Sequence, residues 1–230
     1  MAWRVREVRH GGKLACPLRL IPEKQQYKEI TERTSMRYHN ITKDDMRNGD
    51  GLRAVLWVAG CSHGCKGCHN PITWDICGGI PFDEAAKAEL FEALKPSYIS
   101  GITFSGGDPL HEKNREETGA LIEEIKETFP EKTIWVYTGF LWEEIRDLPC
   151  MKKVDVVVDG PFIEELKDNT LHWKGSSNQR VIDVQKTLAE GKVVLHDTRF
   201  GRMARLQRNE ISKAFDCGRG NINAERPFPS

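Results

Sequence analysis

Residues 52–68 read LRAVLWVAGCSHGCKGC, an apolar run of the kind that forms a buried strand, followed at once by a loop rich in cysteine. The loop contains three cysteines, Cys61, Cys65 and Cys68, and no fourth one lies close enough to complete the pattern. Cubane iron-sulfur clusters in electron carriers normally have four thiolate ligands, so three would leave one iron open to another ligand. Gly64 and Gly67 relax the backbone enough for the three thiols to converge on one centre.

Three other interpretations of the cysteine loop compete with an open cluster. A structural zinc ion could use His63 or His69 as its fourth ligand, because three cysteines and one histidine form an ordinary tetrahedral zinc site. Cys77 is within reach and could supply a fourth thiolate, but its Ile-Cys-Gly-Gly setting is typical of a turn with a small buried thiol. A disulfide would leave one of the three thiols unpaired, and the N-terminus does not read as a signal peptide.

Length and charge divide the chain into a core and two ends. Its 230 residues suit one domain with appendages. Residues 1–35 carry 8 basic and 4 acidic residues, residues 197–230 carry 7 and 4, and neither end shows sustained hydrophobic periodicity. We therefore expect a basic N-terminal extension (1–35), a core (36–196) and a basic C-terminal tail (197–230). Neither end has the basic density of a nucleic-acid surface, and no apolar stretch is long enough to span a membrane.

Within the core, strand-like and helix-like runs alternate. We predict strands at 52–58, 99–104, 133–138 and 154–158, helices at 82–95, from the loop at 105–109 to about 129, and at 141–148, and weaker strands at 180–184 and 193–195. Repeated β-then-α order predicts an α/β fold with a parallel sheet and right-handed crossovers.

Polar motifs follow each of the four predicted strands. The cysteines follow the first, Gly106 and Gly107 the second, Thr138 the third and Asp159 the fourth. Functional residues of parallel sheets gather at the carboxyl ends of the strands, so we expect these motifs to share one edge. A zinc knot has no need of that coincidence.

The loop Ser105-Gly106-Gly107-Asp108-Pro109 has two interpretations. Its glycines let the backbone N–H and C=O groups approach a ligand, and Asp108 adds a carboxylate. Beside an open iron, this arrangement suits a small zwitterion whose amino group pairs with the acid. Alternatively, Asp108 is only the N-cap of the following helix, with Pro109 in its first turn.

The C-x3-C-x2-C loop after one strand and the glycine-rich loop after the next resemble the radical S-adenosylmethionine superfamily. More narrowly, six ordered blocks resemble the activating proteins of anaerobic ribonucleoside-triphosphate reductase. These blocks are Gly60-Cys61, Cys68-His69-Asn70-Pro71 with Thr73-Trp74, Ser105 to Leu110, Trp135-Val136-Tyr137-Thr138-Gly139, Val158-Asp159-Gly160-Pro161-Phe162 and Gly175-Ser176-Ser177-Asn178-Gln179. The resemblance runs from about residue 36 to residue 184.

The resemblance implies a partial (β/α) barrel with a [4Fe-4S] cluster on Cys61, Cys65 and Cys68 and S-adenosylmethionine on the open iron. An electron from an external donor such as a flavodoxin would cleave the sulfonium, and the resulting 5′-deoxyadenosyl radical would make a glycyl radical on the reductase. The implied S-adenosylmethionine contacts are Gly67, Cys68 and His69 on the adenine side and Gly106, Gly107 and Asp108 on the methionine side. Such chemistry, and free thiols, predict a cytoplasmic location.

The chain departs from the motifs of the family that it resembles at two positions, Gly67 and Tyr137. Gly67 stands where many superfamily members carry an aromatic residue, so stacking on adenine passes to His69. Related activases also hold a monovalent cation near the substrate; Asp159 matches that pattern and Thr138 matches it less closely, but Tyr137 replaces an expected acid. Asp159-Gly160 is more typical of a tight turn. Cys68-His69-Asn70-Pro71 and Trp74 also resemble activases of other glycyl-radical enzymes such as pyruvate formate-lyase. We assign Trp135 and Phe162 to the core.

Overall fold

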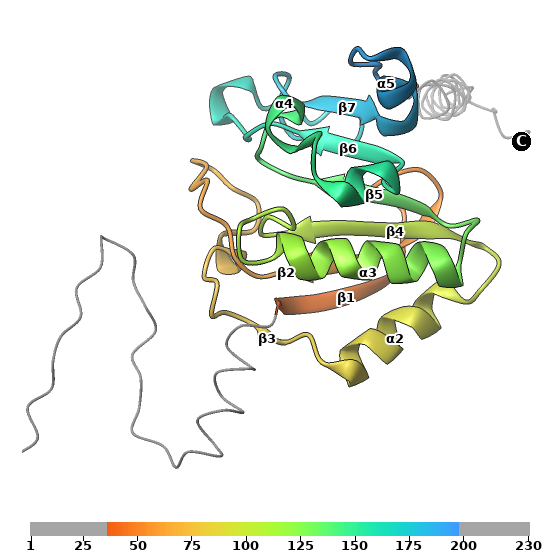
Figure 1. The fold of residues 1–230 in the computed structure, drawn as a ribbon. Coiled ribbons are helices and arrows are strands. Elements are labelled where there is room, and N and C mark those ends of the chain that lie inside the picture. Colours follow the sequence, from red (N-terminus) through yellow and green to blue (C-terminus); the bar gives the residue numbers. More distant parts are fainter. Residues whose placement is uncertain (1–35, 198–230) are drawn as a thin grey trace, which may run out of the picture.

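The computed structural model describes residues 36–197. The predicted N-terminal extension, and residues 198–230 of the predicted tail, lie outside the described residues, as do Cys16 and Cys217. Seven strands form one sheet in the order β3-β1-β2-β4-β5-β6-β7 (Figure 1). Their bounds are β1 (Arg37–Asp45), β2 (Leu52–Val58), β3 (Ile80–Pro81), β4 (Ile99–Gly106), β5 (Thr133–Tyr137), β6 (Val156–Asp159) and β7 (Arg180–Asp183).

The sheet is parallel only in its middle. β2, β4, β5 and β6 pair in parallel, so the four strands predicted from the apolar runs are confirmed. The prediction of a parallel sheet is wrong for the edges, because β1 runs antiparallel to β2 and β3, and β7 runs antiparallel to β6. Parallel neighbours need a long crossover, usually a helix. A short turn joins β1 to β2, and only a 3-10 turn lies between β6 and β7.

Four α-helices and three 3-10 turns complete the described fold. They are α2 (Glu84–Leu94), α3 (Arg115–Thr128), α4 (Trp142–Ile145), α5 (Val184–Glu190), η1 (Pro71–Thr73), η2 (Pro149–Lys152) and η3 (Glu164–Leu166). α2 begins two residues later than predicted, after Asp83, whose carboxylate accepts a hydrogen bond of 2.9 Å from the Ala86 amide. The predicted helix at 141–148 is shorter, a single turn followed by η2. Across residues 36–197 we find no helix with the length and apolar character that a bilayer crossing needs.

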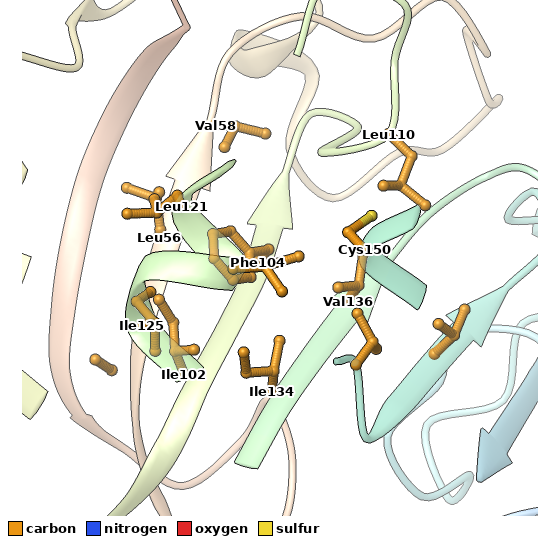
Figure 2. Packing of buried hydrophobic residues seen from close by; sticks show 14 of the residues in the cluster. Leu56, Val58, Ile102, Phe104, Leu110, Leu121, Ile125, Ile134, Val136 and Cys150 are labelled. Atoms are coloured by element: carbon orange, nitrogen blue, oxygen red, sulfur yellow. The ribbon is translucent and has the colours of Figure 1, made fainter. Parts of the chain in front are cut away.

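The helices and the sheet bury the main core between them. Alternate strand residues point toward the helices, since successive side chains of a strand face opposite sides. Figure 2 shows this packing, with Phe104 of β4 beside Leu121 and Ile125 of α3. Cys150 is also part of this core, as expected of a thiol without a chemical role. The strand residues of this face are Ala54, Leu56, Val58, Ile102, Phe104, Ile134, Val136 and Val157.

The opposite, inner face of the sheet is more polar. Arg53 of β2 is fully buried there, although its strand reads as apolar. Its guanidinium donates to the Thr103 hydroxyl (2.8 Å) and to the Thr133 hydroxyl and carbonyl (both 2.8 Å), and it lies 5.3 Å from the Trp135 ring centre. Burial lowers the pKa of Arg53 to about 10. Arg53 and Trp135 therefore fill the inner face near the amino ends of the strands.

We expect Phe104→Ala to lower the free energy of unfolding by about 3–5 kcal/mol, because it removes a fully buried ring and leaves a cavity between β4 and α3. Urea unfolding followed by circular dichroism measures the change. The control is Met46→Ala, since Met46 is 70% exposed in the turn after β1. Equal effects of the two substitutions would contradict the described core.

Candidate metal centre and cofactor pocket

The loops after β2, β4, β5 and β6 surround a cavity of about 320 Å³. This volume is within the range of small-molecule sites. In Figure 1 this edge of the sheet lies on the left, where the arrowhead of β4 points and the orange loop after β2 projects. Gly67 and Asp159 are not part of the lining. The lining brings together most of the predicted site residues, namely Cys61, Cys65, Cys68, His69, Gly106, Gly107, Asp108 and Thr138.

The cysteine loop is held by backbone contacts to the segment that follows it. The Gly60 amide donates to the Thr73 carbonyl (2.7 Å) and the Cys61 amide to the Trp74 carbonyl (3.1 Å). Gly64 and Gly67 have φ of +59° and +69°, a region that side chains disfavour. These positions let the chain turn twice within eight residues, so all three thiols can border one cavity.

Zinc and a cluster place different demands on three thiols that border one cavity. Tetrahedral zinc places its sulfur ligands about 3.8 Å apart, from a Zn–S distance of about 2.3 Å. In a cubane cluster each thiolate binds a different iron, so the sulfurs stand farther apart. Within residues 36–197, no group of three or more His, Cys, Asp or Glu side chains is arranged to hold one metal ion. Cys77, which we expected to be buried, is exposed and does not line the cavity.

Burial and charge act on the Cys61 thiol before any metal binds. Burial raises its pKa to about 11, and the nearby Asp108 carboxylate and the other two thiols act in the same direction. The thiolate is the form that binds metal, and a bound cation stabilises that form. A cationic group in the cavity would therefore complement the site.

The glycines after β4 allow the next loop to approach β2 closely. The Gly107 amide donates to the Val58 carbonyl at 2.8 Å. A Cβ atom on Gly107 would lie 2.5 Å from the Gly60 carbonyl oxygen, and one on Gly106 would lie 2.8 Å from that of Val58. Any larger residue would separate the glycine loop from the cysteine loop.

Asp108 is the most connected side chain of the pocket and is only 1% exposed. Its Oδ1 accepts from the Leu110 amide (2.8 Å) and the Thr138 hydroxyl (2.9 Å). Its Oδ2 accepts from the Gly139 amide (3.0 Å), bonds to His63 Nε2 (2.6 Å) and also receives the Thr138 hydroxyl (3.0 Å). One carboxylate thus connects the loops after β2, β4 and β5.

The alternative in which Asp108 caps a helix is wrong. α3 begins at Arg115, and its N-cap is Asn114. The Asn114 side-chain amide donates to the carbonyl oxygens of Ala59 and Asp108, both at 2.9 Å. Asn114 therefore supports the junction of the cysteine and glycine loops, a role the sequence did not indicate.

His63 reaches across the pocket from the cysteine loop. Its ring packs edge-to-face on Phe140, with centroids 4.7 Å apart, and its Nε2 atom bonds to Asp108. This hydrogen bond raises the pKa of His63 above its ordinary value. Sequence reasoning considered His63 only as a zinc ligand, because its partner lies 45 residues away in the chain.

Thr138 and Asp159 both have protein partners in this arrangement. The Thr138 hydroxyl is engaged with Asp108. Asp159 accepts from the Trp142 amide (2.8 Å) and from the Arg180 guanidinium, which also pairs with Glu143. Arg180 thereby neutralises the Asp159 carboxylate at the end of β6.

The segment after β6 forms the far wall of the cavity. Phe162 lines it, with its ring centre 5.4 Å from that of His69, so our assignment of Phe162 to the core is wrong. Trp135, in contrast, is buried as expected. Behind the loop, the Glu164 side chain occupies the space beside Gly67 and pairs with Lys66 at 3.0 Å. Such an exposed pair adds little stability but fixes the loop against η3.

We expect Asp108→Ala to destabilise the protein by about 2–4 kcal/mol, because buried donors from three loops lose their acceptor. Asp108→Asn keeps one acceptor oxygen and should cost less. Urea unfolding ranks the variants, and iron analysis shows whether metal uptake falls in parallel. An alanine variant within about 0.5 kcal/mol of wild type would contradict the hub described for Asp108.

Comparison with known proteins adds an independent line of evidence. A family model described as a 4Fe-4S single cluster domain matches residues 47–182. Proteins named anaerobic ribonucleoside-triphosphate reductase-activating protein are similar over most of their length. The one from Enterobacteria phage T4 is 45% identical over 146 residues, which cover 64% of this chain and 93% of the relative. The one from Escherichia coli K12 is 41% identical, and the match covers 64% of this chain and 97% of the relative. The one from Pasteurella multocida is 37% identical, and the match covers 63% of this chain and 95% of the relative. The chain therefore belongs to the family of anaerobic ribonucleoside-triphosphate reductase-activating proteins.

Proposed function

We propose that this protein activates anaerobic ribonucleoside-triphosphate reductase by generating a glycyl radical on its catalytic subunit, with a [4Fe-4S] cluster and S-adenosylmethionine as cofactors. One observation carries the proposal: three cysteine thiols, without a fourth, border the same cavity as a glycine loop and a buried carboxylate. The names of the relatives and the matched cluster domain support both the partner and the cluster.

The fold supports assignment to the radical S-adenosylmethionine type of partial barrel. The helices α2 and α3 pack in one core on the same face of the sheet, and the other face is lined by Arg53, Trp135 and the cavity residues. The cavity lies at the carboxyl edge, where parallel α/β sheets place their ligands. We also propose that residues 36–196 carry the catalytic core and that 1–35 and 197–230 are extensions to it.

The pocket residues divide between cluster and substrate. Cys61, Cys65 and Cys68 would hold the cluster. Gly106 and Gly107 would offer backbone groups to the methionine part, with Asp108 near its ammonium group, and His69 beside Phe162 would face adenine, with Gly67 behind it. When bound, the cluster would supply one electron for the cleavage of S-adenosylmethionine to methionine and a 5′-deoxyadenosyl radical; hydrogen transfer from a glycine Cα of the reductase would then give 5′-deoxyadenosine and the glycyl radical. The protein contributes binding, orientation and exclusion of water.

The electron would come from an external one-electron donor such as a flavodoxin. We place the protein in the cytoplasm, because cysteine ligands and a reduced cluster need reducing surroundings. Two rival functions are less well supported. Activation of another glycyl-radical enzyme, such as pyruvate formate-lyase, is not favoured by the names of the relatives, and a zinc-stabilised binding domain is not favoured by the matched cluster domain.

Replacement of Cys61, Cys65 or Cys68 by alanine should lower iron after anaerobic reconstitution from about four atoms per chain toward zero. Release of 5′-deoxyadenosine should stop with it, because the cluster supplies the electron. The matched control is Cys77→Ser, since Cys77 lies outside the cavity lining. Normal 5′-deoxyadenosine release by a cysteine-loop variant, or one zinc and no iron in the wild type, would refute the proposal.

Exposed apolar side chains stand next in the chain to residues that line the cavity. Ile72 (73% exposed) and Trp74 (38% exposed) follow the cysteine loop, and Ile163 (36% exposed) follows Phe162 on the opposite wall. Hydrogen transfer needs direct contact between the radical and the target glycine. We propose that the reductase segment that carries this glycine packs on these residues as it approaches the cavity.

Ile72→Lys should lower the yield of glycyl radical on the reductase several-fold, because a charge replaces exposed apolar contact area. Cleavage of S-adenosylmethionine with a chemical reductant should continue, since Ile72 does not line the cavity. Electron paramagnetic resonance measures the radical, and chromatography measures 5′-deoxyadenosine. Tyr98→Lys, at the amino edge of the sheet, should change neither. Equal radical yields from both variants would place the docking surface elsewhere.

A further inference from the structure

The Asp108 carboxylate has no capacity left for another donor. An ionised carboxylate offers about four lone-pair sites. The Leu110 amide and the Thr138 hydroxyl use those of Oδ1, and the Gly139 amide and His63 Nε2 use those of Oδ2. The side chain is also almost completely buried. An ammonium group that binds Asp108 must therefore replace one of these four donors.

Three of the four donors belong to the framework of the pocket. The Leu110 and Gly139 amides are backbone groups, and Thr138 directly follows β5, with its own amide bonded to the Val158 carbonyl at 3.0 Å. His63 is different, because its side chain is longer than that of Thr138 and less buried. It also lines the cavity, and its side chain is 19% exposed.

The position of the His63 ring depends on Gly139. A Cβ atom at Gly139 would lie 2.4 Å from His63 Cδ2 and 2.6 Å from Nε2, so any side chain there would push the ring from Asp108. On the cysteine loop itself, a Cβ atom at the neighbouring Gly64 would meet nothing within 4 Å. The His63 ring is therefore tightly packed where it meets Asp108, whereas the cysteine loop has open space at Gly64.

We infer that His63 occupies the ammonium-binding position on Asp108 while S-adenosylmethionine is absent, and that the ammonium group of S-adenosylmethionine displaces it. The inference rests on the proposed function and deepens it. His63 is thus a positioning residue. Because it stands between Cys61 and Cys65, its displacement couples occupation of the substrate pocket to the conformation of the cysteine loop. A nucleoside without an ammonium group has no means of displacing it.

The test compares ligand affinities of cluster-loaded proteins by equilibrium dialysis. Two variants break the bond from opposite sides: His63→Ala removes the ring, and Gly139→Ala pushes it away. Both should bind S-adenosylmethionine about tenfold more tightly than wild type, because no charge-assisted hydrogen bond must first be broken. His63→Gln restores a side-chain donor and should return the affinity toward wild type. Affinity for 5′-methylthioadenosine, which lacks the ammonium group, should not change.

A coupling measurement sharpens the test. In an Asp108→Asn background, His63→Ala should no longer raise the affinity for S-adenosylmethionine, because the two side chains act through one bond. Unchanged or weaker binding by the alanine variants that carry four irons would overturn the inference. So would an equal gain for 5′-methylthioadenosine, or failure of both alanine variants to take up the cluster, which would make the bond a structural requirement. Failure of wild type with four irons to bind S-adenosylmethionine would instead reject the proposed function.

Discussion

The Asp108 carboxylate is the constraint on which the pocket depends. It receives hydrogen bonds from the loops after β4 and β5 and bonds to His63 of the cysteine loop, so one buried charge sets the spacing of three segments. Such a group is costly to bury unless every lone pair is used. Here all are used, and the same saturation that stabilises the site also controls what can approach it. The Asp108 side chain therefore both stabilises the pocket and selects its ligand.

The rest of the fold serves to bring those loops together. Parallel pairing of β2, β4, β5 and β6 aligns four strand ends at one edge. The core between the sheet and the helices holds that edge rigid, while the inner face leaves room for a cavity. Glycines at 106 and 107 then allow the glycine loop to lie against the cysteine loop. This is the physical reason why a short chain can build a cofactor pocket from motifs spread over 100 residues or so.

Much of this arrangement could be predicted from the sequence, and the remainder could not for definable reasons. The four central strands and the helices α2 and α3 can be predicted from apolar periodicity. The parallel order of these strands then predicts that the motifs after them share one edge of the sheet. The weaker strand predicted at 180–184 is confirmed as β7, whereas β1, which is only partly buried, was not predicted. Arg53 was hidden in an apolar run, although the alternation of Arg53, Thr103 and Thr133 with larger apolar residues is a signal for a polar inner face. The bond between His63 and Asp108, and the place of Phe162 on the cavity wall, depend on loops that meet only in three dimensions.

The buried arginine at the other end of the inner face has a consequence for oxygen sensitivity. Arg53 and Trp135 are packed there with almost no exposed surface, so the cavity opens toward the carboxyl edge. If the proposed function holds, dioxygen would reach a bound cluster from the same edge that the reductase approaches. A docked partner would then block the access of dioxygen, and the cluster would be exposed to oxidation only in the protein without its partner.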